Sequence, residues 1–137
     1  MNLLIPAIFV NLITLAFFLH SKLHDSYLLL IMIIGQLILI DGEVKKNREK
    51  IQVSHILFTV TLLIGLFYFN EFHNKIFILI VLGITLSTRY IYSECAFNLS
   101  NDHYKFDFEK YIEFINWGDI YKICFFIIIY RIINDCR

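Results

Sequence analysis

The sequence predicts an all-α integral membrane protein with four transmembrane helices, arranged as two helical hairpins, and a C-terminal interfacial or fifth membrane helix. Three observations lead to this fold class. Hydrophobic residues make up 58% of the 137 residues. Charged residues make up 18%, against about 25% in an average soluble domain. The apolar residues also gather in four runs separated by short polar segments. One soluble core of this size cannot bury so many apolar residues, so lipid is the expected solvent.

The first hairpin is expected from residues 3–19 and 27–40. A helix over residues 3–19 is about 26 Å long, close to the ~30 Å hydrocarbon core of a bilayer. No basic segment precedes this run and no small-residue cleavage site follows it, which favours a retained span over a cleaved signal peptide. The second run is short, but its flanking residues can lengthen it and a bilayer can thin locally.

The second hairpin is expected from residues 53–69 and 76–92, so that residues 1–93 form one four-span bundle. Both hairpins consist of a span, a short polar link and a second span. A duplicated hairpin would have this layout. Any four-span protein with short links would have it too, and we prefer that simpler explanation.

The distribution of basic residues predicts the orientation of the spans. The expected loop 41–52 carries four of them, Lys45, Lys46, Arg48 and Lys50. The two links on the opposite side carry one lysine each. Because loops rich in lysine and arginine stay in the cytoplasm, the 41–52 loop and both termini of the four-span unit are expected there.

Residues 94–137 form an aromatic-rich amphipathic and apolar tail. Tyr104, Phe108, Tyr111 and Ile115 recur at helical spacing, which indicates an amphipathic helix in the membrane interface, although the stretch 104–109 also alternates like a strand. Between about 115 and 133 a further helix could either pack at the interface or cross as a fifth span, with its two basic residues reaching opposite surfaces. We favour the interfacial position.

Polar and small residues inside the spans are candidates for helix packing. Asn11 in the first span and Gln36 in the second are expected to hydrogen-bond between helices, because a polar group in lipid needs an internal partner. Gly35, Gly65 and Gly83 are expected at points of close helix approach. A polar track for an ion or small solute is the alternative for the same residues.

Arg89 is the one charged residue within the four apolar runs. An arginine within a bilayer costs about 2.5–3.5 kcal/mol on insertion scales, so it needs a partner or an exit to the surface. Asp41 is expected on the same side, and an Arg89–Asp41 pair would join the second span to the fourth.

The sequence indicates no cofactor, metal or catalytic site. His20 and His24 are four residues apart and could share a helix face, with His73 in the other outer link, but no cysteine or carboxylate pattern supports a zinc site. The three cysteines include no C-x-x-C pair. Cys95, close to the membrane edge, is a candidate for lipidation.

A non-enzymatic structural, assembly or accessory-subunit role in a membrane complex is therefore the leading functional hypothesis. The partners would be the bilayer and other protein chains or further copies, and not nucleic acid, because twelve basic residues balance twelve acidic ones. The many Ile, Phe, Tyr, Asn and Lys residues fit AT-rich codons and thus a viral or organellar origin. An oligomeric, viroporin-like channel or small-solute transporter is the alternative. A membrane-interface enzyme that uses His103, Asp107, Glu109 and Glu113 is a third and weaker one.

Overall fold

The computed structural model describes residues 3–92 and 116–137. These residues form five helices and no strand: α1 (Leu4–His20), α2 (Leu23–Lys45), α3 (Arg48–Tyr68), α4 (Phe72–Tyr92) and α7 (Trp117–Asp135). The all-helical prediction is therefore confirmed for the described residues. Three helices, α2, α3 and α4, are long and apolar enough to cross a membrane, and α1 is a shorter apolar helix.

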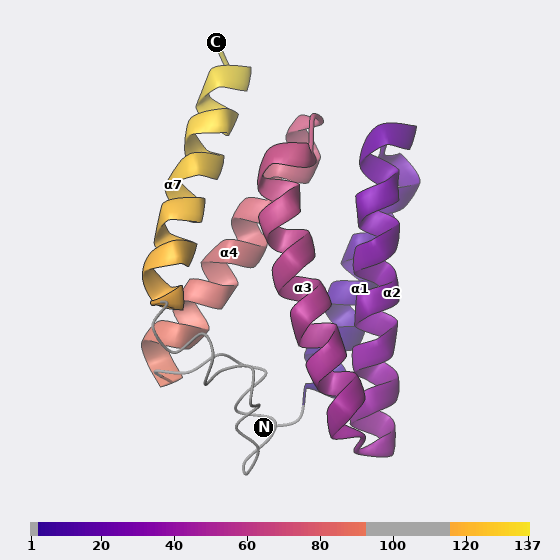
Figure 1. The fold of residues 1–137 in the computed structure, drawn as a ribbon. Coiled ribbons are helices and arrows are strands. Elements are labelled where there is room, and N and C mark those ends of the chain that lie inside the picture. Colours follow the sequence, from indigo (N-terminus) through magenta and orange to yellow (C-terminus); the bar gives the residue numbers. More distant parts are fainter. Residues whose placement is uncertain (1–2, 93–115) are drawn as a thin grey trace.

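Consecutive helices run in opposite directions and divide the bundle into two units (Figure 1). In one unit α2 packs against both α1 and α3, and in the other α4 packs against α7. Contacts of α3 with α4 and α7 are sparse. Figure 1 shows α3 and α4 close together near the 69–71 link and well separated at the opposite end. The bundle is thus a wedge that is closed at the 69–71 end.

The links are shorter than the polar segments of the sequence indicate. We expected a loop over residues 41–52, but only Lys46 and Asn47 are outside the helices there. The expectation was wrong because loss of hydrophobicity does not end a helix when the backbone hydrogen bonds continue. Helix α2 ends where Lys46 adopts a left-handed conformation (φ 51°), and the N–H of Asn47 donates to the Gly42 carbonyl at 2.8 Å. The Asn47 side chain then accepts the N–H of Lys50 at 3.2 Å and caps α3.

The main core lies where the two units meet. Leu29 of α2, Leu66 of α3, Ile78 of α4 and Ile128 of α7 are almost completely buried in one cluster. A smaller cluster at the other end contains Leu3, Ala7, Leu39 and Ile51 and joins α1, α2 and α3. The main cluster therefore fixes the closed end of the wedge.

Two of the three predicted packing glycines mark close approaches between helices. A Cβ atom on Gly65 would lie 3.0 Å from the Cδ1 atom of Ile78 and 3.1 Å from the ring of Phe69. A Cβ atom on Gly35 would lie 3.4 Å from the Cβ atom of Leu57, where α2 packs on α3. By contrast, a Cβ atom on Gly83 would meet nothing closer than Phe125, at 3.9 Å. Gly65 is thus the most restricted of the three predicted packing glycines.

Helix α7 lies alongside α4 and antiparallel to it, with its C-terminal end at the same end of the bundle as the 69–71 link (Figure 1). Its outward residues include Phe126 and Tyr130, which are 69% and 66% exposed. Its inward residues Tyr121 and Ile128 are 2% and 0% exposed. The middle of α7 therefore has an apolar exterior and a packed interior, whereas the side chains of Asp119 and Lys122 near its N-terminal end are 59% and 64% exposed.

Candidate functional site

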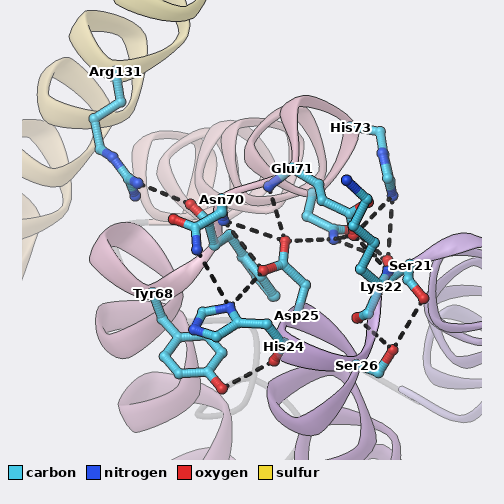
Figure 2. A network of polar contacts seen from close by, with 12 residues as sticks. Ser21, Lys22, His24, Asp25, Ser26, Tyr68, Asn70, Glu71, His73 and Arg131 are labelled. Atoms are coloured by element: carbon cyan, nitrogen blue, oxygen red, sulfur yellow. Dashed lines mark hydrogen bonds and ion pairs between the residues drawn. The ribbon is translucent and has the colours of Figure 1, made fainter.

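The densest group of polar side chains lies at the closed end of the wedge, where the 21–22 and 69–71 links meet (Figure 2). We call it the polar end cluster. It consists of Ser21, His24, Asp25, Tyr68, Asn70, Glu71, His73, Asn74, Lys75, Arg131 and Asp135. All five described helices end or begin close to this cluster.

Asp25 is at the centre of the polar end cluster and is 1% exposed. Its carboxylate accepts the backbone N–H groups of Asn70 at 3.2 Å and Glu71 at 3.0 Å. It also accepts the side-chain amide of Asn74 at 2.9 Å, and Nδ1 of His24 lies 3.0 Å away. A buried carboxylate is stable when charge-assisted hydrogen bonds replace its water, and Asp25 has three amide donor groups and the His24 imidazole around it.

Helix dipoles reinforce this arrangement. Asp25 lies in the first turn of α2, and the N–H groups that it accepts come immediately before α4. The N-terminal end of a helix carries a partial positive charge and N–H groups without helical partners, so an acidic side chain there is favourable. The Asp25 carboxylate thus stabilises the N-terminal ends of both α2 and α4.

Asn74 and Ser21 extend the cluster to α1. The Asn74 amide, 0% exposed, donates to the Ser21 hydroxyl at 2.9 Å, and the same hydroxyl lies 3.2 Å from Nε2 of His73. The backbone N–H of Lys22 donates to the Glu71 carboxylate at 2.8 Å. These contacts join the α1–α2 link to the first turn of α4.

His24 and Tyr68 join α2 to the end of α3. Their rings are stacked, with centroids 4.3 Å apart and an interplanar angle of 11°. The Tyr68 hydroxyl donates to the His24 carbonyl oxygen at 2.9 Å. The ring of His24 is thereby held against both Tyr68 and Asp25.

Lys75 and Arg131 attach α7 to the other helices. Lys75, with 6% of its side chain exposed, forms an ion pair with Asp135 at the end of α7. The guanidinium of Arg131 donates to the carbonyl oxygens of Leu66 and, at 2.8 Å, Phe69. The last carbonyls of a helix lack helical partners and carry a partial negative charge, so a cation there is favourable.

A second polar group lies midway along α1 and α2. The Asn11 amide donates to Oε1 of Gln36 at 3.1 Å, and Nε2 of Gln36 donates to the Thr14 hydroxyl at 2.9 Å. The Thr14 hydroxyl in turn donates to the Val10 carbonyl at 2.8 Å. The structure therefore brings Asn11 and Gln36 together, with their amides directed at each other.

The predicted pair of Arg89 with Asp41 is not formed. Asp41 instead pairs with Lys45, one helical turn away at 2.7 Å, and with Lys50 across the α2–α3 link. The guanidinium carbon of Arg89 lies 5.3 Å from the ring centroid of Tyr121 on α7, a cation–π arrangement. The pair was predicted from depth alone, and depth does not say which face of a helix a residue occupies.

The histidines that we considered as metal ligands have other partners. Nδ1 of His20 lies 2.8 Å from the Ala16 carbonyl oxygen, while His24 and His73 belong to the polar end cluster. Within residues 3–92 and 116–137 no group of three His, Cys, Asp or Glu side chains is placed to hold a metal ion. Cys95 and the candidate acid–base group His103, Asp107, Glu109 and Glu113 lie outside the described residues.

An apolar cavity of about 170 Å³ opens within the wedge, between α1, α2, α3 and α4. Ala7, Met32, Leu57 and Val81 are among the apolar residues that line it. Polar residues also reach its wall: Gln36, Ser54, Thr61, Thr85 and Thr88. The cavity and the polar end cluster thus occupy different parts of the bundle.

Sequence reasoning did not find the central residues of the polar end cluster. Asp25, Asn74 and Lys75 fall in the polar segments between the expected spans, and Arg131 was expected to reach the membrane surface. One signal was present: Asp25 stands two residues before the apolar run 27–40, and an acid is favourable at the start of a helix. Its partners in the 69–71 link and the first turn of α4, however, are 45 to 49 residues away in the chain.

The fold and the two polar groups define a helical bundle in which polar side chains join helices and satisfy helix ends. Comparison with protein-family models, curated proteins and solved structures finds no match to this chain.

Proposed function

We propose that this chain is a multi-pass membrane protein with a structural, assembly or accessory-subunit role. The observation that carries the proposal is the use of its polar side chains: Asn11 and Gln36 bond to each other between helices, and Asp25 bonds to helix ends. Groups engaged in this way maintain a fold, whereas a reaction centre needs groups directed at a substrate.

The apolar exterior supports a membrane location. Only 28%, 33% and 33% of the candidate spans in α2, α3 and α4 is buried inside the bundle. Outward residues of α1 such as Ile5 and Phe9 are 79% and 63% exposed. Apolar surfaces of this extent are rare on soluble monomers and are expected against lipid or partner helices.

We further propose that α7 crosses the membrane as a fifth span, in place of the interfacial position that we favoured from sequence. It lies antiparallel to α4, its outer face is apolar, and Lys75 and Arg131 hold its C-terminal part at the far end of the bundle. The α2–α3 link and the basic helix ends on either side of it, with Lys45, Lys46, Arg48 and Lys50, would then face the cytoplasm and residues 136–137 the other side.

Cross-linking of the full chain in its own membranes, followed by mass spectrometry, tests the structural role. We expect reproducible cross-links to the same one or few membrane proteins, or between copies of this chain, and retention in the membrane after alkaline extraction. A chain that alkali releases, or that cross-links only in proportion to the abundance of its neighbours, would contradict the proposal.

The channel alternative is tested by ion flux into liposomes that contain the purified chain. It requires Asn11 and Gln36 to line a pore. Flux that Asn11→Leu or Gln36→Leu abolishes, and that Leu12→Ala on the outer face leaves unchanged, would support the channel and overturn the structural role.

A further inference from the structure

The cavity in the wedge has an apolar wall despite the hydroxyl and amide groups around it. The hydroxyls of Thr61 and Thr85 donate to the carbonyls of Leu57 and Val81, four residues earlier, at 2.7 and 2.9 Å. Such bonds turn the hydroxyl toward the helix backbone. Ser54 likewise donates to the Ile51 carbonyl at 3.1 Å.

Gln36, the one amide among the described residues of the cavity wall, is also hydrogen-bonded at both of its polar atoms. Its Nε2 donates to Thr14 and its Oε1 accepts from Asn11, so both polar atoms are directed at α1. A water molecule in a protein cavity needs two to four polar partners. The wall therefore favours an apolar occupant.

The volume of the cavity and the length of its wall along α4 fit part of a narrow, linear molecule. An apolar cavity of about 150 Å³ can hold a molecule as large as benzene, and this one measures about 170 Å³. On α4 its wall extends from Phe77 to Thr88, or about 16 Å of helix. A stable protein interface buries about 800 Å² on each partner, far more than a cavity of this size offers.

The charge near one end of the cavity is complementary to a phosphate group. The wall of the cavity includes Leu39 and Ser54, which flank the α2–α3 link on either side. Lys46 lies in that link, seven residues after Leu39, which corresponds to about 10 Å along the helix. Lys46 and Arg48 are exposed there, whereas Lys45 and Lys50 are paired with Asp41.

We propose that the wedge binds one acyl chain of a bilayer phospholipid, with the phosphate near the basic α2–α3 link. This inference rests on the membrane location proposed above. The acyl chain fills the space that the divergence of α4 from α3 leaves open, and it completes the apolar packing that the main core supplies only at the closed end.

Photo-labelling in vesicles tests the inference. The full chain is reconstituted in phosphatidylcholine that contains a small fraction of phosphatidylcholine with a diazirine on one acyl chain, and the labelled residues are located by mass spectrometry. We expect label on the inward residues Met32 and Leu57 as well as on the outward residue Phe9. Ala7→Phe, which fills the cavity, should reduce the inward label several-fold and leave the outward label unchanged.

Leu12→Phe, on the outer face of α1, is the matched control. It should change neither the inward label nor the outward label. Thr85→Leu fills the cavity from the opposite wall and replaces Ala7→Phe if that variant does not fold. Inward residues without label, or inward label that neither filling variant reduces, would overturn the inference. Unlabelled inward residues together with a disulfide between copies in Leu57→Cys would show a second copy in the wedge instead. A chain that does not float with the vesicles would overturn the proposed membrane location itself.

Discussion

The side-chain amide of Asn74 donates to the carboxylate of Asp25 at 2.9 Å, and the two residues are 0% and 1% exposed. This contact joins the first turn of α2 to the first turn of α4. Because Asn74 also bonds to Ser21, three helix ends meet around one buried carboxylate. The closed end of the wedge therefore depends on Asp25.

Asp25→Ala should destabilise the fold strongly. The substitution leaves the N–H groups of Asn70 and Glu71 without their acceptor and removes one of the bonds of the Asn74 amide, and each unsatisfied buried group costs about 1–3 kcal/mol. We expect the free energy of unfolding to fall by about 3 kcal/mol, measured by urea titration in detergent micelles. Asp119→Ala removes an exposed acid from the first turn of α7 and should cost less than about 1 kcal/mol. Equal losses for the two variants would contradict the role of Asp25.

The Asn11–Gln36 pair should show a modest coupling energy. Interhelical hydrogen bonds in membrane bundles contribute about 0.6 kcal/mol on average and at most about 1.7 kcal/mol. A double-mutant cycle with Asn11→Leu and Gln36→Leu, measured by unfolding in micelles, should give a coupling in this range. A cycle of Leu12→Ala with Gln36→Leu should give none, since Leu12 faces outward. Strictly additive effects of Asn11→Leu and Gln36→Leu would show that the bond contributes nothing to packing.

The ion pair of Lys75 with Asp135 should couple α7 to α4. Asp135→Ala leaves the buried ammonium of Lys75 without its partner, which we expect to cost about 1–3 kcal/mol of unfolding free energy. Lys75→Met in addition removes the uncompensated charge, so the double variant should be more stable than Asp135→Ala alone. Urea titration of the two variants measures this. A double variant less stable than Asp135→Ala would mean that the ammonium has another partner of equal strength.

Alanine substitutions at Gly65 and Gly83 should change the stability of the fold in opposite directions. Ile78 and Phe69, which a Cβ atom on Gly65 would meet, are both 0% exposed and have little room to move. Gly65→Ala should therefore cost about 1–3 kcal/mol. Gly83→Ala meets only an ordinary contact and should stabilise the helix by up to about 1 kcal/mol. Thermal unfolding of the pair checks the signs, and a stabilising Gly65→Ala would contradict the close packing of α3 on α4.

The apolar runs of the sequence predicted α1 to α4 well, because a helix that is surrounded by lipid or by other helices must consist mainly of apolar residues. The helix ends at the α2–α3 link were not predicted, since Lys46 and Asn47 stop the helices through backbone conformation and a cap. The contact of Asn11 with Gln36 was predictable because two amides at similar depth need partners. Asp25 was not, because its main partners are N–H groups of a distant link. Its role depends on how the two units meet.

The most direct test of the account is the position of Cys136 relative to the α2–α3 link. Cys136 is exposed at the end of α7 and Cys124 is buried. A membrane-impermeant maleimide is applied to sealed, oriented vesicles that contain a variant with Cys136 as its only cysteine (Cys95→Ser, Cys124→Ala). A second variant carries Glu49→Cys as its only cysteine. We expect the two cysteines to react from opposite faces, which five spans require. Reaction of both from the same face would show that α7 does not cross the membrane and would contradict the five-span bundle.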